Sequence, residues 1–226
     1  MNLVLFDLDH TLIPFDSGMA WTRFLVDRGV LPARAEETYL GFCRQYVVGT
    51  LDIHAMHQAS VAPLARFPRA LLTQWTREFE VAMRSRVPAG MRDVVRRHLD
   101  DGDVCAVVTA TTRFIAEPWA RLFGVCHVVA TEAATVDGTP DGAVTGEIEG
   151  LPCFREHKVT RVRQWLARQA PGGFTDIGAF ERSWFYSDST SDQALLSAVS
   201  DPVAVRPDAR LRLHALEAGW RIFDSA

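Results

Sequence analysis

The spacing of apolar residues predicts one short strand followed by a long helical segment. The apolar run Leu3–Phe6 shows no alternation and ends at an aspartate, as expected for a strand buried on both faces of a parallel sheet. From Asp16 to Arg86 the apolar positions recur at helical spacing, and proline or glycine separates one stretch from the next. Helices are therefore expected from Asp16 or Ser17 onward and over Arg34–Val47, Asp52–Ala65 and Arg69–Val87.

From Pro88 onward the pattern predicts strands that alternate with helices. The expected strands are Val104–Val108, Val125–Ala130, Trp184–Ser187, Val203–Val205 and Trp220–Phe223. The expected helices are Met91–Leu99, Thr112–Phe123, His157–Gln169, Asp192–Val199 and Ala209–Ala218. Two Asp-Gly steps within residues 131–150 predict a β-hairpin, and Pro171-Gly172-Gly173 predicts a turn.

Strands that alternate with helices favour an α/β fold with a Rossmann-like parallel sheet that is covered by helices on both faces. A chain of 226 residues is long enough for one such core with a modest insert. We expect residues 1–15 and 87–226 to form the core and residues 16–86 to form an all-helical insert. Because ligands bind beyond the carboxyl ends of parallel strands, the residues that follow the strands are the candidates for function.

The composition narrows the range of partners. A formal net charge of -4 gives no general attraction to nucleic acid or to an anionic membrane, and no apolar run approaches the roughly 20 residues that span a bilayer. The first ten residues hold two aspartates and no basic segment, which is atypical of a signal peptide. The four cysteines form no Cys-x-x-Cys pair and are expected to be free thiols. We therefore expect a cytoplasmic protein without a nucleic-acid or membrane partner.

Acidic side chains follow two of the predicted strands. Asp7 and Asp9 end the first strand only two residues apart, and two carboxylates so close together repel each other unless a cation offsets their charge. Mg²⁺ prefers such hard oxygen ligands. Asp188 ends a later strand, and Asp192 lies one turn beyond it. Taken separately, each of these aspartates also fits an ordinary helix cap.

A hydroxyl and an ammonium complete the candidate chemistry. Thr109 ends a predicted strand and is followed by Ala110, so a hydroxyl and free backbone N–H groups are available to a phosphate. Of the 24 basic residues, Lys158 is the only lysine, and it lies at a predicted helix start, where a cation opposes the helix dipole. A threonine cap and a solvated lysine are the ordinary alternatives. As a set in this order, the four stretches are more specific than any one of them.

This set resembles the motifs of the haloacid dehalogenase (HAD) superfamily, in which an Asp-x-Asp-x-Thr motif precedes a Ser or Thr, a Lys and an acidic pair. The segments Phe-Asp-Leu-Asp-His-Thr-Leu and Tyr-Ser-Asp-Ser are similar to the phosphoserine-phosphatase-like subfamily IB, and the helical insert resembles a type C1 cap. The resemblance covers nearly the whole chain. It implies a HAD-like fold and a Mg²⁺-dependent phosphatase that acts on a small phosphorylated metabolite.

The resemblance also implies a role for each motif residue. Asp7 is expected to attack phosphorus and form an aspartyl-phosphate, and Asp9 is expected to act as general acid and then general base. The expected Mg²⁺ ligands are Asp7, the backbone carbonyl of Asp9, and Asp188. The residues expected to bind the phosphate or to support the site are Thr109, Ala110, Lys158, Asp192 and Thr11.

The residues that recognise the substrate are expected on the insert. Asp16 lies where phosphoserine phosphatases carry a glutamate that binds the substrate amine, and Arg44 and Tyr46 are further candidates. Those enzymes also use a cap arginine for the substrate carboxylate, and their pattern leads here to Ser60 instead. A phosphoserine-like and a histidinol-phosphate-like substrate therefore both stay open.

Three histidines near these segments are given no catalytic role. His10 fits local packing beside the expected nucleophile, and His54 and His57 are expected on a solvated helix face. Two other functions stay open: a phosphotransferase that passes the aspartyl-phosphate to an acceptor other than water, and a non-catalytic binding module on the same fold. The oligomeric state also stays open.

Overall fold

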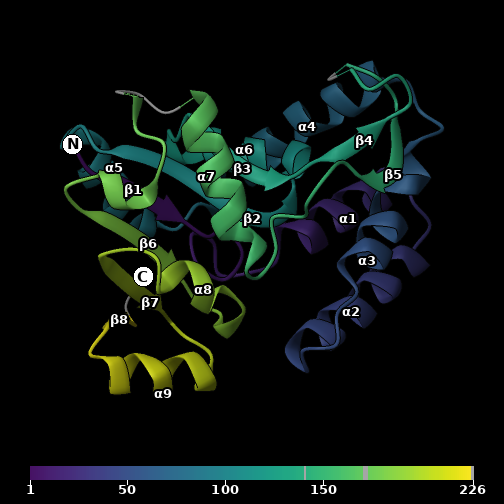
Figure 1. Cartoon of the computed structure of the whole chain (residues 1–226). Coiled ribbons are helices and arrows are strands. Elements are labelled where there is room, and N and C mark those ends of the chain that lie inside the picture. Colours follow the sequence, from purple (N-terminus) through teal and green to yellow (C-terminus); the bar gives the residue numbers. More distant parts are fainter. Residues whose placement is uncertain (140, 170–172, 225–226) are drawn as a thin grey trace.

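The computed structural model describes residues 1–139, 141–169 and 173–224, and the predicted turn at Pro171-Gly172 lies outside them. A six-stranded sheet forms the centre of the molecule, and every neighbouring pair of its strands is parallel. The strands lie in the order β3 (His127–Thr131), β2 (Val104–Thr112), β1 (Leu3–Phe6), β6 (Ser183–Ser187), β7 (Asp201–Val205) and β8 (Arg221–Phe223). The expected Rossmann-like α/β sheet is confirmed (Figure 1).

Helices cover both faces of this sheet. On one face, Val4 and Phe6 of β1 belong to an apolar cluster with α5 (Ala89–Asp100) and α6 (Arg113–Phe123). On the other face, Leu3 and Leu5 pack in a second cluster with residues of three further helices, which are α7 (His157–Gln169), α8 (Gln193–Leu196) and α9 (Ala209–Ala218). Alternate residues of a strand point to opposite faces, so β1 needs an apolar residue at each position.

Four helices lie between β1 and α5. They are α1 (Ser17–Asp27), α2 (Arg34–Val47), α3 (Ile53–Val61) and α4 (Arg69–Met83). Phe79 of α4 packs against Trp21 of α1, with ring centroids 5.2 Å apart, and against Trp119 of α6, at 5.8 Å. All three side chains belong to the cluster that contains Val4 and Phe6. The helical insert therefore shares one hydrophobic core with the sheet.

The predicted hairpin forms from β4 (Ala133–Thr135) and β5 (Val144–Ile148), which pair antiparallel. β5 lies against α3 (Figure 1). Gly146 is needed at this contact, because a Cβ there would lie 2.6 Å from the Cβ of Ala62 and the backbone has a φ of +98°. The hairpin thus ties the helical insert to the segment between β3 and α7.

Several element ends differ from the expectation. β2 continues to Thr112, four residues past its expected end, and its register with β3 shifts between Val108 and Thr112. Asp192 lies in a 3₁₀ turn before α8, and α3 passes into a 3₁₀ turn that contains Pro63. Tertiary pairing and proline therefore move element ends that apolar spacing alone cannot place.

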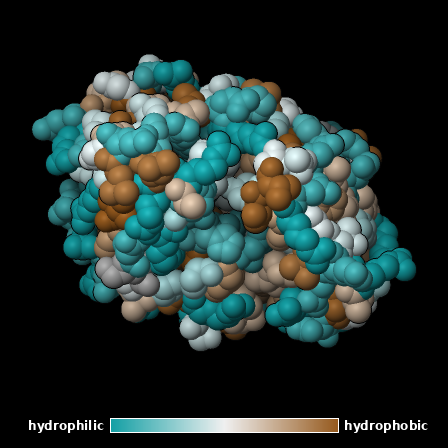
Figure 2. Space-filling view, turned by 90° about the horizontal axis from the view of Figure 1, so that it is seen from below, coloured by the Kyte–Doolittle hydropathy of each residue, from teal (hydrophilic) through white to brown (hydrophobic). Residues whose placement is uncertain are grey.

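The surface is mostly hydrophilic on the face shown in Figure 2, where apolar residues form separate patches. Exposed apolar side chains include Val47 and Val48 at the end of α2 and Leu213 and Leu216 on α9. Within the described part of the chain, no helix has the length and apolar character to cross a membrane. The largest fully buried side chains of the described residues all belong to the two interior clusters.

We predict that Phe79→Ala destabilises the whole molecule in one step. Phe79 is fully buried, and its truncation leaves a cavity between the insert and α6, which should cost about 3–5 kcal/mol of unfolding free energy. Denaturant unfolding, followed by fluorescence and far-UV circular dichroism, should show a single transition at a lower midpoint. Val81→Ala on the same helix, where Val81 is 69% exposed, should change the free energy by less than about 0.5 kcal/mol. Two separate transitions in Phe79→Ala would contradict a shared core.

Candidate active site

The site is built around a buried ammonium between two carboxylates. Asp7 directly follows β1, and Lys158 lies in the first turn of α7. The Lys158 Nζ atom donates to Asp7 Oδ1 at 2.8 Å and to Asp192 Oδ2 at 2.7 Å, and the lysine is only 2% exposed. Burial by itself would lower the pKa of Lys158, but the carboxylates of Asp192 and Asp7 more than offset this effect and raise it. Lys158 therefore stays charged inside the protein.

Carboxylates outnumber this one ammonium at the site. Burial raises the pKa of Asp7 to about 7, opposed by Lys158 and reinforced by the negative charges of Asp192 and Asp9. Burial, followed by repulsion from Asp7 and Asp192, also holds the pKa of Asp188 well above its ordinary value. Ionised carboxylates at this density are costly in a buried setting. A cation that binds among them would stabilise their charged form.

Asp9 has a different environment from Asp7. It accepts hydrogen bonds from the backbone N–H of Ser17 at 2.6 Å and from the Thr111 hydroxyl at 2.7 Å. Burial, and then repulsion from Asp16, raise the pKa of Asp9 to about 6, although these hydrogen bonds act in the opposite direction. A carboxyl group with this pKa can both give and take a proton near neutral pH.

The two predicted hydroxyl residues lie close to the acidic segments, Thr11 in the loop after β1 and Thr109 within β2. The Thr11 hydroxyl accepts from the backbone N–H of Asp188 at 3.0 Å and donates to Asp188 Oδ1 at 3.2 Å, so Thr11 ties the first acidic segment to the second. The Thr109 hydroxyl is buried and accepts from the backbone N–H of Thr111 at 3.1 Å. Thr109 and Ala110 both line the cavity that contains Asp7 and Lys158.

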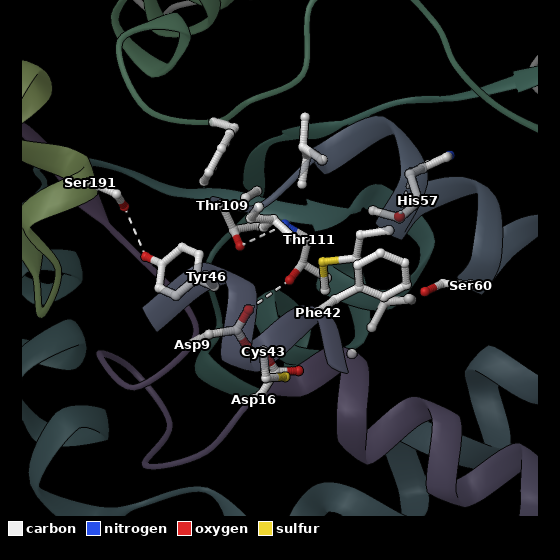
Figure 3. Close-up of a pocket in the computed structure, with 18 of the residues that line it drawn as sticks. Asp9, Asp16, Phe42, Cys43, Tyr46, His57, Ser60, Thr109, Thr111 and Ser191 are labelled. Carbon is white, nitrogen blue, oxygen red and sulfur yellow. Dashed lines mark hydrogen bonds between the residues drawn. The ribbon is translucent and has the colours of Figure 1, made fainter. Parts of the chain in front are cut away.

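This cavity, of about 190 Å³, lies between the strand ends and the helical insert. Asp16 lines it, accepts from the backbone N–H of Met19 at 2.7 Å as the N-cap of α1, and accepts from the Tyr39 hydroxyl at 2.9 Å. Figure 3 shows Asp9 and Asp16 close together, with Phe42, His57 and Ser60 farther along the cavity. Apolar and aromatic side chains form much of the wall, and they include Trp21, Phe42, Val47, Leu51, Ile53, Met56, Ile115 and Phe154.

Two expectations about the insert need correction. Arg44 is exposed and is not among the residues that line the cavity, so the structure does not bring it to the site, whereas Tyr46 and Ser60 do line it. His57 is buried, and only His54 is exposed as expected. His57 is buried in the cavity wall, where its Nδ1 atom lies 3.2 Å from the Thr112 hydroxyl at the end of β2.

Three residues of the site escaped the sequence interpretation. Thr111 binds Asp9, Tyr39 binds Asp16, and Arg206 donates to the backbone carbonyls at positions 10 and 11 at 2.9 Å each. The sequence could have indicated Thr111, because it lies only two residues beyond Thr109. No sequence pattern indicates Tyr39 or Arg206, because tertiary packing alone brings them to the first acidic segment. Arg206 braces a loop in which His10 has a φ of +58°.

The donor set is suited to a magnesium ion. A cation would stabilise the ionised form of the Asp7 and Asp188 carboxyl groups, which would bind it through oxygen. The backbone carbonyl of Asp9 can add a third oxygen ligand. In the part of the chain that is described, no three His, Cys, Asp or Glu side chains are grouped to hold a metal by themselves. The expected set needs only two such side chains together with the carbonyl group.

The sequence matches proteins of known class. A family model for haloacid dehalogenase-like hydrolases matches residues 4–197. Over 225 residues the chain is 38% identical to a histidinol-phosphatase of Neisseria meningitidis serogroup C (strain 8013). The matched region covers 99% of this chain and 98% of that protein. It is 30% identical to the phosphoserine phosphatase SerB1 of Mycobacterium tuberculosis (strain ATCC 25618 / H37Rv), over 97% of this chain and 69% of that protein.

Solved structures match over the same length. A protein of unknown function from Bordetella pertussis Tohama I has a TM-score of 0.86 at 42% identity, over 99% of this chain and 98% of that chain. A substrate-bound phosphoserine phosphatase has a TM-score of 0.63 at 17% identity, over 99% and 92%, and shares the fold.

The structure is an α/β fold with an acidic site beyond the strand ends. The chain belongs to the haloacid dehalogenase-like hydrolase family. The resemblance stated from the four motifs is thereby confirmed, and so is the expected enzyme class, a phosphatase of this superfamily.

We predict that His57 makes the fold sensitive to acid. Burial lowers the pKa of His57 to about 4, so at pH 5 the folded protein leaves this residue neutral while the unfolded chain protonates it. Unfolding then takes up a proton, and stability falls as the pH drops from about 6.5 towards 4. The contribution lost between pH 7 and pH 5 should be up to about 2 kcal/mol.

Urea unfolding at pH 7 and pH 5 measures this loss. His57→Gln should reduce the difference in unfolding free energy between the two pH values, because glutamine does not titrate. His54→Gln, at an exposed position of the same helix, should leave the difference unchanged. Equal pH dependence in the unchanged protein and in His57→Gln would rule out this role.

Proposed function

We propose that this chain is a Mg²⁺-dependent phosphomonoesterase that works through an aspartyl-phosphate on Asp7. The observation that carries the proposal is the convergence of Asp7, Lys158, Asp188 and Asp192, from three distant stretches of the chain, on one cavity. This set has a carboxylate nucleophile, a fixed positive charge and an acid-rich place for a metal ion. Together these groups are suited to the transfer of a phosphoryl group.

In the first step the nucleophile is Asp7. Lys158 holds Oδ1 of Asp7, and Oδ2 forms the new bond to phosphorus as the bond from phosphorus to the leaving oxygen breaks. Lys158 and the Thr109 hydroxyl, with the backbone N–H at Ala110, would bind the phosphoryl oxygens. Asp7, Asp188 and the Asp9 carbonyl would hold Mg²⁺, whose charge would offset the repulsion between the carboxylate and the phosphate.

Asp9 would move the protons in both steps. In its protonated form it donates a proton to the leaving oxygen, so that the leaving group departs as a neutral alcohol. The resulting carboxylate then takes a proton from the water that attacks phosphorus, and inorganic phosphate and free Asp7 are released. A pKa of about 6 makes both protonation states of Asp9 accessible near neutral pH.

We propose that residues 16–86 act as the cap over this site. Asp16, Tyr39, Cys43 and Met56 come from that segment and line the cavity opposite the strand ends. The core would then be residues 1–15 with 87–226, which carry the phosphoryl chemistry. The cap would select the leaving group, since it supplies most of the wall that lies away from Lys158.

The proposed substrate is an amino-alcohol phosphate with a flat ring, such as histidinol phosphate. Among the described residues that line the cavity, Lys158 is the one Lys or Arg, and the proposed mechanism assigns it to the phosphoryl group. No cation is therefore left to bind a substrate carboxylate, as phosphoserine would need. Asp16 offers a negative charge to a substrate ammonium, and the aromatic walls suit a ring. The related histidinol-phosphatase supports this choice.

The proposal includes a small-molecule partner and a cytoplasmic location. The location rests on the four cysteines, all of which are free thiols, because disulfides are typical of oxidising compartments.

We predict that Asp7→Asn abolishes turnover and leaves the protein folded. The amide removes the nucleophile, while Lys158 keeps Asp192 as its partner. Phosphate release from p-nitrophenyl phosphate with Mg²⁺ should fall at least about a thousandfold. Asp27→Asn, at an exposed residue of α1, should keep full activity, and EDTA should remove the activity of the unchanged protein. Substantial turnover by folded Asp7→Asn would remove Asp7 from this role.

We predict that Asp16→Asn raises KM selectively for substrates that carry an amine. Asparagine can still cap α1, so the change removes the charge and keeps the helix start. KM for histidinol phosphate should rise about tenfold to a hundredfold, the size expected for loss of a charged hydrogen bond. KM for p-nitrophenyl phosphate, which has no amine, should change much less.

Asp52→Asn is the matched control, because Asp52 caps α3 in the same way and is exposed. It should leave both KM values unchanged. Equal increases for both substrates in Asp16→Asn would show that Asp16 acts on cavity shape and does not bind an ammonium.

A further inference from the structure

The loop that carries two of the site carboxylates is held from the helical insert. Residues 187–192, here called the acid loop, run from the end of β6 to the start of α8 and include Asp188 and Asp192. The Tyr46 hydroxyl, from α2, donates to Ser189 Oγ at 2.7 Å and lies 2.8 Å from Ser191 Oγ. Figure 3 shows the Tyr46 ring extending towards Ser191.

Hydrogen bonds connect this contact to the nucleophile. The backbone N–H of Ser189 donates to Ser187 Oγ at 3.3 Å, and the Ser187 hydroxyl donates to Asp192 Oδ2 at 2.7 Å. The same Asp192 oxygen accepts from Lys158, which also holds Asp7. A displacement of Ser189 would therefore be passed through Ser187 to Asp192, the carboxylate that holds the Lys158 ammonium.

The other side of the acid loop is held by the sheet domain itself. Asp208, the N-cap of α9, accepts from the backbone N–H of Thr190 at 2.7 Å and from its hydroxyl at 2.6 Å. Ser189 also accepts from the backbone N–H of Ser191 at 3.2 Å, which shapes the turn. The core also holds Asp188 through Thr11 and Asp192 through Lys158, so Tyr46 adds the contact that the insert makes with the middle of this loop.

We infer that Tyr46 is a positioning residue that fixes the acid loop, and with it Asp188 and Asp192, when α2 is seated on the core. This inference rests on the proposed function for the roles of the two aspartates. It differs from a direct role in substrate recognition, because the Tyr46 hydroxyl is bonded to Ser189 and Ser191. A second contact seats the same end of α2, since Arg155 donates to the Gly49 carbonyl at 2.9 Å.

Tyr46→Phe tests the inference, because it keeps the ring and removes only the hydroxyl. In ligand-free protein, amide hydrogen exchange in residues 187–192 should rise about threefold to tenfold, the factor expected for loss of an ordinary hydrogen bond. With p-nitrophenyl phosphate, kcat should fall by a similar factor while KM stays within about twofold, since the loop holds groups that act on the reacting phosphoryl.

Two further variants make the experiment specific. Tyr186→Phe removes a hydroxyl that lies 2.9 Å from Nε2 of His98 in α5 and makes no hydrogen bond with Tyr46. This change should leave acid-loop exchange and kcat unchanged. Ser191→Ala removes one partner of Tyr46, and its effect on kcat should not add to that of Tyr46→Phe, because both changes break the same contact.

The outcomes separate the possible roles. A lower Tm in Tyr46→Phe with unchanged exchange and unchanged kcat would identify a merely structural residue and overturn the inference. A lower kcat with unchanged exchange would also overturn it, since the hydroxyl would then act on the substrate. If the unchanged protein hydrolyses no phosphomonoester, the proposed function fails, and the exchange measurements still decide whether Tyr46 holds the loop.

Discussion

The buried pairing of one ammonium with several carboxylates is the constraint on which the site depends. A charge in the interior is tolerated only when it is paired, and Lys158 is paired with Asp7 and Asp192. This pairing requires β1, β6 and α7 to meet at one point, which the parallel sheet provides by aligning the carboxyl ends of its strands. The fold and the chemistry are thus fixed by the same contacts.

The sequence was sufficient for the parts of the structure that depend on local pattern. The bounds of β1, α2, α7 and α9 agree with those expected from apolar spacing, and the four motif stretches converge as their order implied. It was insufficient where tertiary packing decides. The end of β2 depends on its pairing with β3, and the burial of His57 depends on Thr112, 55 residues away. Arg44 lies on α2 as expected, but apolar spacing does not say which side of that helix faces the cavity.

The insert and the core are tied together at several levels. Phe79 links them through the apolar cluster, His57 through a hydrogen bond to β2, and Tyr46 through the loop that bears Asp188. His57 and Tyr46 themselves line the cavity, and Phe79 belongs to the apolar cluster that contains Val4 and Phe6. The insert is therefore attached to the core by an apolar contact, by a hydrogen bond to β2 and by a hydrogen bond to the acid loop.

The distribution of charge along the cavity also limits what can bind there. At one end the excess of carboxylates over ammonium repels a phosphate unless a metal cation enters with it. At the other end Asp16 is buried, which raises its pKa, and Asp16 in turn raises the pKa of Asp9. A substrate ammonium beside Asp16 would stabilise its charged form and weaken that repulsion. The proposed substrate, with a phosphate at one end and an ammonium near the other, would therefore fit both ends, whereas a second anionic group has no further Lys or Arg among the described cavity residues.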